Sequence, residues 1–331
     1  MSRILLIATG GTIACVPSAD GLAPGLGAQQ LLSCLPGLRC QVDCIDLFNM
    51  DSSNIQPEEW QQMAKTILLH MGDYDGIVIT HGTDTMAYTA SMLTFLLQNL
   101  PLPVVLTGAQ WPIVRPDSDG RANLGHAILA AQHLPGGVYI CFGNAVMRGC
   151  RAVKTRTTSL NAFESINAPY VGTVVDGRFI DFTLAGGEKT GEDRHFAYFA
   201  KIEPNVALVK LIPGTTARQL SILSACDVRG VVVEAFGLGG VSSFRRDHAE
   251  ALRGLMEQGI PVVLTSQCLY EASTPDVYEV SKPLREAGVI SAGDMTTEAA
   301  VTKLMWALAQ GGEMEDVRRL MLTDICGEIT R

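Results

Sequence analysis

The stretch ILLIATGGTIA, residues 4–14, decides the fold class, because an apolar strand runs directly into a glycine-bearing turn and a threonine. A second stretch, GIVITHGTDT at residues 76–85, repeats this arrangement and places Thr83 beside Asp84. Open α/β sheets bind their ligands at the carboxyl ends of their strands. Two hydroxyls at strand ends, one of them beside a carboxylate, indicate a nucleophile site rather than a phosphate cradle.

Each turn also has a simpler explanation when it is taken alone. A glycine pair after a strand suits an ordinary turn, since glycine tolerates positive φ, and Thr83-Asp84 before a helix suits an N-cap. A third segment, residues 149–155, favours a functional site, because it brings Lys154 to a loop just beyond a strand. Most lysines are solvated surface residues. An ammonium beside a Thr-Asp pair, however, can hold the aspartate ionised and share the proton of a hydroxyl or water.

Apolar strands alternate with amphipathic helices along most of the chain. This pattern predicts a two-domain α/β fold: a larger N-terminal three-layer domain with a mostly parallel, flavodoxin- or Rossmann-like sheet, and a smaller C-terminal α/β domain. A Gly- and charge-rich stretch suggests a linker at 189–204 between domains at 1–188 and 205–331. The predicted strands are 3–8, 39–47, 75–80, 103–107, 137–142, 206–212, 229–235 and 261–265, with a hairpin region at 171–184. The predicted helices are 28–35, 57–71, 84–98, 119–132, 217–224, 246–257 and 296–309.

The composition excludes several classes of function. The chain has 331 residues, 47% of them hydrophobic and 18% charged, and a formal net charge of −9. Binding to nucleic-acid phosphates needs clustered Lys and Arg, so no nucleic-acid partner is expected. No stretch is long enough to span a membrane, and the five apolar residues after Arg3 are too few for a signal peptide. We therefore expect a cytoplasmic protein.

The nine cysteines also favour a cytoplasmic location. Their number is odd, their spacing is irregular and no C-x-x-C occurs, so neither a zinc ribbon nor a thioredoxin-type motif is predicted. Free cysteines in this number are typical of a reducing compartment. We expect most of them to be core residues. Cys268, which follows a predicted strand, is the one candidate for a site neighbour, although packing is favoured for it as well.

The two strand-end motifs and Lys154 resemble the bacterial-type L-asparaginases, threonine amidohydrolases that include the glutaminase-asparaginases. The resemblance extends over most of the chain, and the two motifs together are highly specific. The early start of the first motif, the form of the Asp51 segment and the lack of a signal are most similar to the cytoplasmic, type I branch. Further segments that carry the resemblance are Asp51-Ser52-Ser53-Asn54, Thr107-Gly108-Ala109-Gln110 and Ser118-Asp119-Gly120.

The resemblance implies catalytic roles for the matching residues. Thr12 is the implied nucleophile, which attacks the side-chain amide carbon to give an aspartyl-enzyme ester and ammonia. Thr83 is implied to position or activate water, with Asp84 and Lys154 as a proton relay. A threonine hydroxyl is a weak nucleophile, so it needs a neighbouring base and an oxyanion site, and backbone N–H groups near a helix start can supply the donors.

The resemblance also implies how the substrate is held and how the protein assembles. Asp51, Ser52 and Ser53 are the implied ligands of the α-amino and α-carboxylate groups of L-asparagine, together with Asp84 and Thr83. Ala109 is implied to place a backbone carbonyl near the amide. No metal or organic cofactor is implied, and the family suggests a homodimer or a homotetramer made of two dimers.

Three positions depart from the family pattern. Leu22 stands where the family has a tyrosine on a mobile lid that touches the nucleophile. By resemblance to some animal relatives, Tyr278 is the replacement candidate, with Tyr270 second. Gly240 stands where the family often has an asparagine that reaches a neighbouring subunit. Glu234 stands where a regulated type I relative carries an effector-pocket arginine, so the sequence does not predict activation by asparagine.

Other interpretations stay open. His81 looks catalytic, but the family gives it no primary role, and a histidine in a sharp turn is more often structural. Glutamine as the main substrate differs from asparagine by one methylene, which is worth only about 1–3 kcal/mol of discrimination. A tRNA-dependent amidotransferase chain is expected to carry a domain before the first motif, which here begins at residue 9. A non-catalytic amino-acid sensor is expected to lose some of the set Thr12, Thr83, Asp84 and Lys154, all of which are present.

Overall fold

Strand β1 (Arg3–Gly10) is the strand around which the N-terminal part of the molecule is built. In the computed structural model it pairs in parallel with β4 (Gln41–Met50) on one side and β5 (Gly76–Thr80) on the other. All of its residues after Arg3 are buried, as expected for a parallel strand covered on both faces. The whole sheet has the order β13 (Arg178–Asp181), β12 (Gly172–Val175), β9 (Ala145–Arg148), β8 (Gly137–Phe142), β7 (Pro103–Thr107), β5, β1, β4.

The parallel strands of this sheet follow the flavodoxin-like order 2-1-3-4-5 when they are numbered along the chain as β1, β4, β5, β7 and β8. Strands β9, β12 and β13 extend it in the antiparallel sense. The chain reverses its direction of winding between β1 and β5, so this gap is the topological switch point where such sheets bind ligands. The predicted fold class is confirmed.

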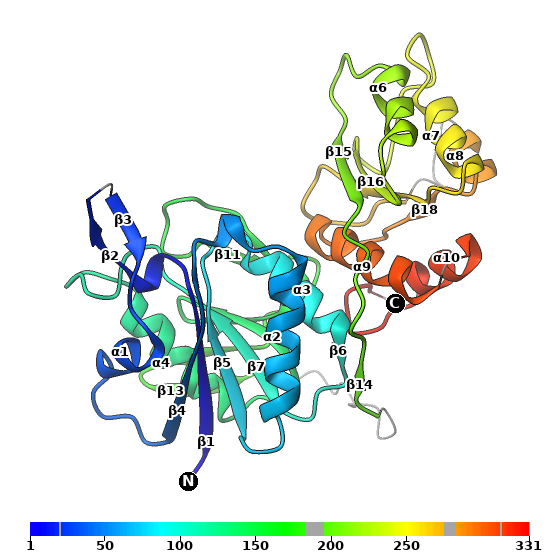
Figure 1. Cartoon of the computed structure of the whole chain (residues 1–331). Helices are drawn as coiled ribbons and strands as arrows, with labels where there is room; N and C mark the ends of the chain where they lie inside the picture. Colours follow the sequence, from blue (N-terminus) through cyan, green and yellow to red (C-terminus); the bar gives the residue numbers. More distant parts are fainter. Residues whose placement is uncertain (20, 183–194, 275–281, 312, 331) are drawn as a thin grey trace. The chain divides into compact units, whose positions relative to one another are not determined.

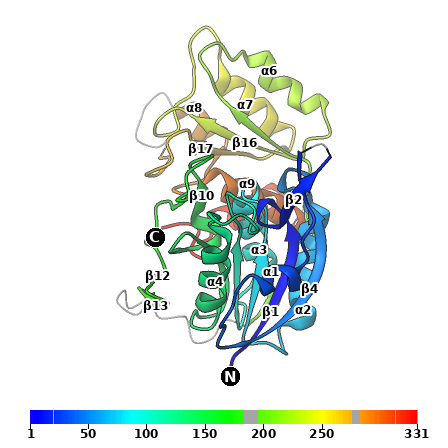
Figure 2. The ribbon, with the colours of Figure 1, turned by 90° about the vertical axis from the view of Figure 1, so that its left-hand side faces the viewer.

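Helices cover both faces of the sheet (Figures 1 and 2). On one face α1 (Ala28–Ser33) and α4 (Gly120–Ala131) pack against Leu6 and Val105 in a large buried apolar cluster. On the other face lie α2 (Pro57–His70) and α3 (Met86–Leu96), which contact each other. Pro57 and the acidic first turn of α2 mark its start as the sequence predicts.

Short elements in the N-terminal part were missed by the sequence pattern. They include the hairpin of β2 (Cys15–Ser18) and β3 (Gly21–Pro24), and a second hairpin of β10 (Ala152–Lys154) and β11 (Phe163–Ser165). Lys154 was expected in a loop; it is instead the last residue of β10. The remaining short elements are η1 (Thr12–Ala14), η2 (Ser52–Asn54), β6 (Leu97–Gln98), η3 (Gly149–Arg151) and β14 (Ala197–Tyr198).

The structure describes residues 1–19, 21–182, 195–274, 282–311 and 313–330, and the chain divides into the compact units Met1–Ala200 and Lys201–Arg331. The second unit contains the parallel strands β15 (Val206–Lys210), β16 (Gly230–Ala235), β17 (Val262–Ser266) and β18 (Ile290–Ser291), in that spatial order. Its helical elements are α6 (Ala217–Ser221), η4 (Ile222–Ala225), α7 (His248–Glu257), α8 (Lys282–Glu286), α9 (Thr297–Gln310) and α10 (Met314–Leu322). Within the ranges described, no helix has the length and apolar character needed to cross a bilayer.

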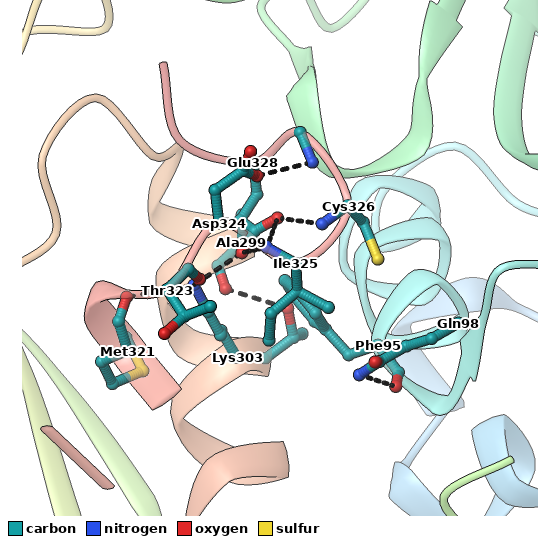
Figure 3. A network of polar contacts seen from close by, with 12 residues as sticks. Phe95, Gln98, Ala299, Lys303, Met321, Thr323, Asp324, Ile325, Cys326 and Glu328 are labelled. Carbon is teal, nitrogen blue, oxygen red and sulfur yellow. Dashed lines mark hydrogen bonds and ion pairs between the residues drawn. The ribbon is translucent and has the colours of Figure 1, made fainter. Parts of the chain in front are cut away.

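A fully buried ion pair ties the end of the chain into this second unit (Figure 3). The Nζ of Lys303, on α9, lies 2.5 Å from Oε1 of Glu328, and neither side chain is exposed to solvent. Lys303 also donates to the carbonyl oxygens of Met321 and Thr323, and Glu328 accepts from the backbone N–H groups of Ile325 and Cys326. These extra bonds are what allow two charges to be buried together.

Candidate active site

Turns that follow neighbouring parallel strands converge at the switch point. The N–H of Gly11, after β1, donates to the carbonyl of Met50 at the end of β4 over 2.8 Å. A Cβ on Gly11 would lie 2.3 Å from the backbone nitrogen of Gly82, and a Cβ on Gly82 would lie 2.6 Å from the Cβ of Ser52. Gly11 also has a φ of +76°. Glycine is therefore required where the turns after β1, β4 and β5 meet.

This contact brings the backbones of the two predicted threonines close together, because Thr12 follows Gly11 and Thr83 follows Gly82. Thr12 begins η1 and is half-buried, while the next residue, Ile13, is fully buried and anchors the turn. In the described parts of the chain the Thr12 hydroxyl makes no hydrogen bond. Thr83 is buried.

Lys154 joins Thr83 to Asp84. Its Nζ donates to Oγ1 of Thr83 over 2.7 Å and to Oδ1 of Asp84 over 2.6 Å. The lysine side chain is 16% exposed and the aspartate side chain 66% exposed. The lysine is therefore mostly buried, and the carboxylate is largely open to solvent. Since Oγ1 of Thr83 accepts from the ammonium, its own proton remains available for donation.

The hairpin that carries Lys154 is held by its own polar contacts. Lys154 pairs across the hairpin with Phe163, and the hydroxyl of Thr155 donates to Glu164 over 2.8 Å. Arg156 forms an ion pair with the same carboxylate at 2.7 Å. A hollow of about 470 Å³ is lined in part by Phe163, Glu164 and Arg156, but by none of the predicted site residues. Lys154 is therefore positioned by the end of a strand whose hairpin is held by hydrogen bonds and an ion pair, and not by an irregular loop.

Asp51 begins the turn after β4, and hydrogen bonds from Ser53 stabilise its charged carboxylate. Its Oδ1 accepts from the N–H of Ser53 at 2.9 Å and from the Ser53 hydroxyl at 2.7 Å. The Ser53 hydroxyl and then its N–H lower the pKa of Asp51 below the ordinary value. Ser52 is buried, and its carbonyl accepts from the Thr85 hydroxyl over 2.8 Å, which joins this turn to the start of α3.

Ala109 is buried in the turn after β7. The Asp119 carboxylate fixes this turn by accepting from the N–H groups of Gln110 and Trp111 at 3.0–3.1 Å. Asn123 adds a bond to the carbonyl of Gly108 at 2.9 Å. The sequence contained Asp119 within a matching motif but gave no reason to assign it this bracing role.

Of the other predicted positions, Tyr278 lies outside the described residues. Leu22 is in β3 and 60% exposed, and Tyr270 is also exposed. Cys268 was expected to pack but is exposed, because it follows the last residues of β17 into a surface turn; all nine cysteines are free. Among the described side chains, no group of three or more His, Cys, Asp or Glu residues is arranged to hold a metal ion.

Comparison with known proteins agrees with the fold and with the motifs. A doubly wound sheet carries polar turns at its switch point, which is where α/β enzymes of this architecture bind their ligands, and a smaller parallel α/β unit follows it in the chain. Residues 3–183 match the family model described as "Asparaginase, N-terminal", and residues 205–321 match "Glutaminase/Asparaginase C-terminal domain". The chain belongs to the asparaginase family.

Relatives are similar over the whole chain. An L-asparaginase from Thermococcus kodakarensis is 39% identical over 99% of both chains, and the solved structure of the thermostable L-asparaginase from that organism superimposes with a TM-score of 0.93. L-asparaginase I from Vibrio cholerae has a TM-score of 0.88 and 32% identity, over 100% of this chain and 99% of that one. A component chain of the glutamyl-tRNA(Gln) amidotransferase from Pyrococcus abyssi is 35% identical, over 100% of this chain and 77% of that one.

Proposed function

We propose that this protein hydrolyses L-asparagine to L-aspartate and ammonia through an ester on Thr12. The observation that carries the proposal is Lys154, which bonds both Thr83 and Asp84 beside the turn of Thr12. The names of the relatives from Thermococcus and Vibrio support the substrate.

The first half of the reaction transfers the aspartyl group to the enzyme. Oγ1 of Thr12 attacks the side-chain amide carbon, the C–N bond breaks, and the proton of the hydroxyl leaves with the nitrogen as ammonia. Oγ1 of Thr12 has no hydrogen-bond partner in the ranges described, which suits a nucleophile that awaits its substrate. The backbone N–H of Thr83, also without a partner there, is available to the developing oxyanion.

The second half returns the enzyme to its starting state. Water attacks the ester carbon, the bond to Oγ1 of Thr12 breaks, and that oxygen regains a proton. The ammonium of Lys154 bonds both Thr83 and Asp84, and this hydrogen-bonded set orients the water and passes its proton. No step needs a metal ion or an organic cofactor.

Charged groups select an α-amino acid amide. Oδ1 of Asp51 is engaged by Ser53, while Oδ2 has no hydrogen bond among the described residues and is available to the substrate ammonium. Ser52 and Ser53 offer donors for the α-carboxylate, Asp84 adds a second acceptor for the ammonium, and the Ala109 carbonyl lies in the turn that would face the amide NH₂.

Location and assembly follow as further parts of the proposal. Nine free thiols support a reducing, cytoplasmic location. A homodimer or a homotetramer is expected from the family resemblance.

The first experiment is ammonia release from L-asparagine and, separately, L-glutamine across a concentration series, with Thr12→Ala as the control. Release from asparagine that disappears in Thr12→Ala supports the proposal, and the ratio of the two kcat/KM values decides the preferred amide. A sigmoidal curve for asparagine would indicate an effector response. Asparagine binding without release from either amide would favour an amino-acid sensor instead.

A further inference from the structure

His81 lies within a buried series of hydrogen bonds to which the proposed mechanism assigns no role. Its ring is fully buried directly after β5. Nδ1 lies 2.7 Å from the carbonyl oxygen of Gly82, and Nε2 lies 3.0 Å from Oγ1 of Thr89 on α3. That hydroxyl in turn accepts from the indole N–H of Trp60 on α2 over 2.9 Å. The chain therefore runs from Trp60 through Thr89 and His81 to Gly82.

The chemistry of the two ends fixes the direction of every hydrogen in the chain. The indole N–H can only donate and the Gly82 carbonyl can only accept. Nδ1 must then carry the ring hydrogen, so Nε2 of a neutral ring accepts the single proton of the Thr89 hydroxyl. Burial lowers the pKa of His81 to about 4, which keeps the ring neutral at physiological pH. Only one tautomer satisfies all the partners.

The chain links the elements that carry the candidate site. Helix α2, with Trp60, begins just after the Asp51–Ser53 turn, and α3, with Thr89, begins just after Thr83 and Asp84. The backbone of His81 is held as well, because its N–H donates to the carbonyl of Thr107 over 2.8 Å. His81 therefore lies where the turns after β4, β5 and β7 are joined.

We infer that His81 is a positioning residue for the proposed reaction, and that it acts by holding the Gly82 carbonyl through Nδ1–H. The peptide between Gly82 and Thr83 is planar and trans, so fixing its C=O also fixes the opposite direction of the Thr83 N–H. The Thr83 side chain starts from the same peptide and must reach Nζ of Lys154 at 2.7 Å. Thr89 and Trp60 hold the ring at the angle this requires. The inference rests on the proposed function.

Two variants distinguish the hydrogen bond from His81 Nδ1–H to the Gly82 carbonyl from the hydrogen bond between Nε2 and Thr89. His81→Asn keeps an N–H donor near the position of Nδ1, and His81→Gln keeps an acceptor near the position of Nε2. Both bury an amide in place of an imidazole, so their unfolding in urea provides a matched stability control. We expect His81→Asn to retain most of the wild-type kcat. His81→Gln should lower kcat about 10- to 100-fold with a much smaller change in KM, as a misplaced reacting group does.

Equal kcat in the two variants, or a larger loss in His81→Asn, would overturn the inference. If neither variant folds, Thr89→Val decides, since it leaves Nε2 without its donor: a lower kcat at unchanged KM supports the inference, and an unchanged kcat contradicts it. A wild-type protein that releases no ammonia contradicts the proposed function alone. In that case the ¹⁵N chemical shifts of the His81 ring test the inference, and a ring protonated on Nε2 instead of Nδ1 would refute it.

Discussion

Nζ of Lys154 lies 2.7 Å from Oγ1 of Thr83, although the two residues are 71 positions apart in the chain. The lysine reaches the hydroxyl from the end of a three-residue strand, and the hydroxyl follows the fully buried strand β5. Together with Asp84 they form a hydrogen-bonded set of an ammonium, a hydroxyl and a carboxylate. The lysine side chain is mostly buried and the carboxylate is largely exposed to solvent.

Lys154→Met should lower kcat for asparagine about 10²- to 10⁴-fold, because the variant loses the cation that joins the Asp84 carboxylate to the Thr83 hydroxyl. Stability should fall by about 1 kcal/mol or less, since the partner carboxylate is largely exposed. Ammonia release and urea unfolding measure the two effects. Lys65→Met, at an exposed position on α2, is the matched control and should behave as wild type. A Lys154→Met enzyme with normal turnover would remove the lysine from the mechanism.

Asp51→Asn should raise KM for asparagine about 10- to 100-fold, the value of one charge-assisted hydrogen bond. The bonds from Ser53 lower the pKa of Asp51 below its ordinary 3.8. Its ionised form therefore contributes to folding above about pH 4, and that contribution is lost only as the pH falls through the lowered value. Wild-type KM should consequently be flat from pH 5 to pH 8. A steep rise in KM between pH 6 and pH 5, or an unchanged KM in Asp51→Asn, would argue against this role.

Tyr278→Phe tests the residue predicted to complete the Thr12 site in place of Leu22. If the Tyr278 hydroxyl assists Thr12, kcat should fall strongly while the unfolding midpoint stays that of wild type. Tyr270→Phe is the natural comparison, since Tyr270 is the second candidate. Unchanged turnover in Tyr278→Phe would exclude it from the mechanism.

Lys303→Met should destabilise the protein by about 3–5 kcal/mol, because it leaves the fully buried Glu328 carboxylate without its cation. The double variant with Glu328→Leu should recover much of this loss, since the uncompensated charge is then gone. Urea unfolding of both variants measures the difference. A single variant as stable as wild type would mean that the pair contributes nothing to the second unit.

Glu298→Gln should change the pH dependence of stability. Burial, and then the charge of Glu234, raise the pKa of Glu298 to about 7 from 4.5. Between about pH 4.5 and pH 7 the folded protein therefore keeps a proton on Glu298 that the unfolded chain has released. The contribution of this group to the free energy of unfolding is fully present below about pH 4.5 and is lost as the pH rises through 7. Relative to wild type, the variant should be more stable at pH 8 than at pH 5. The same difference at both pH values would contradict the raised pKa.

The sequence predicted the parts of this molecule that repeat a pattern. The buried strands β1 and β5 were predictable from their apolar runs, and their turns from glycine next to a hydroxyl, since both signals lie within a few residues. The β10–β11 hairpin could not be predicted, because a strand of three residues carries no periodicity. Nor could the chain through Trp60 and Thr89 be predicted: each is an ordinary residue of a helix, and only tertiary packing places their side chains against His81.

The absence of space for a Cβ between Gly11 and Gly82 limits how the specificity of this scaffold can be changed. Any side chain at either position would drive the two turns apart and displace both threonines together. Libraries that aim at a longer amide should therefore leave both glycines alone.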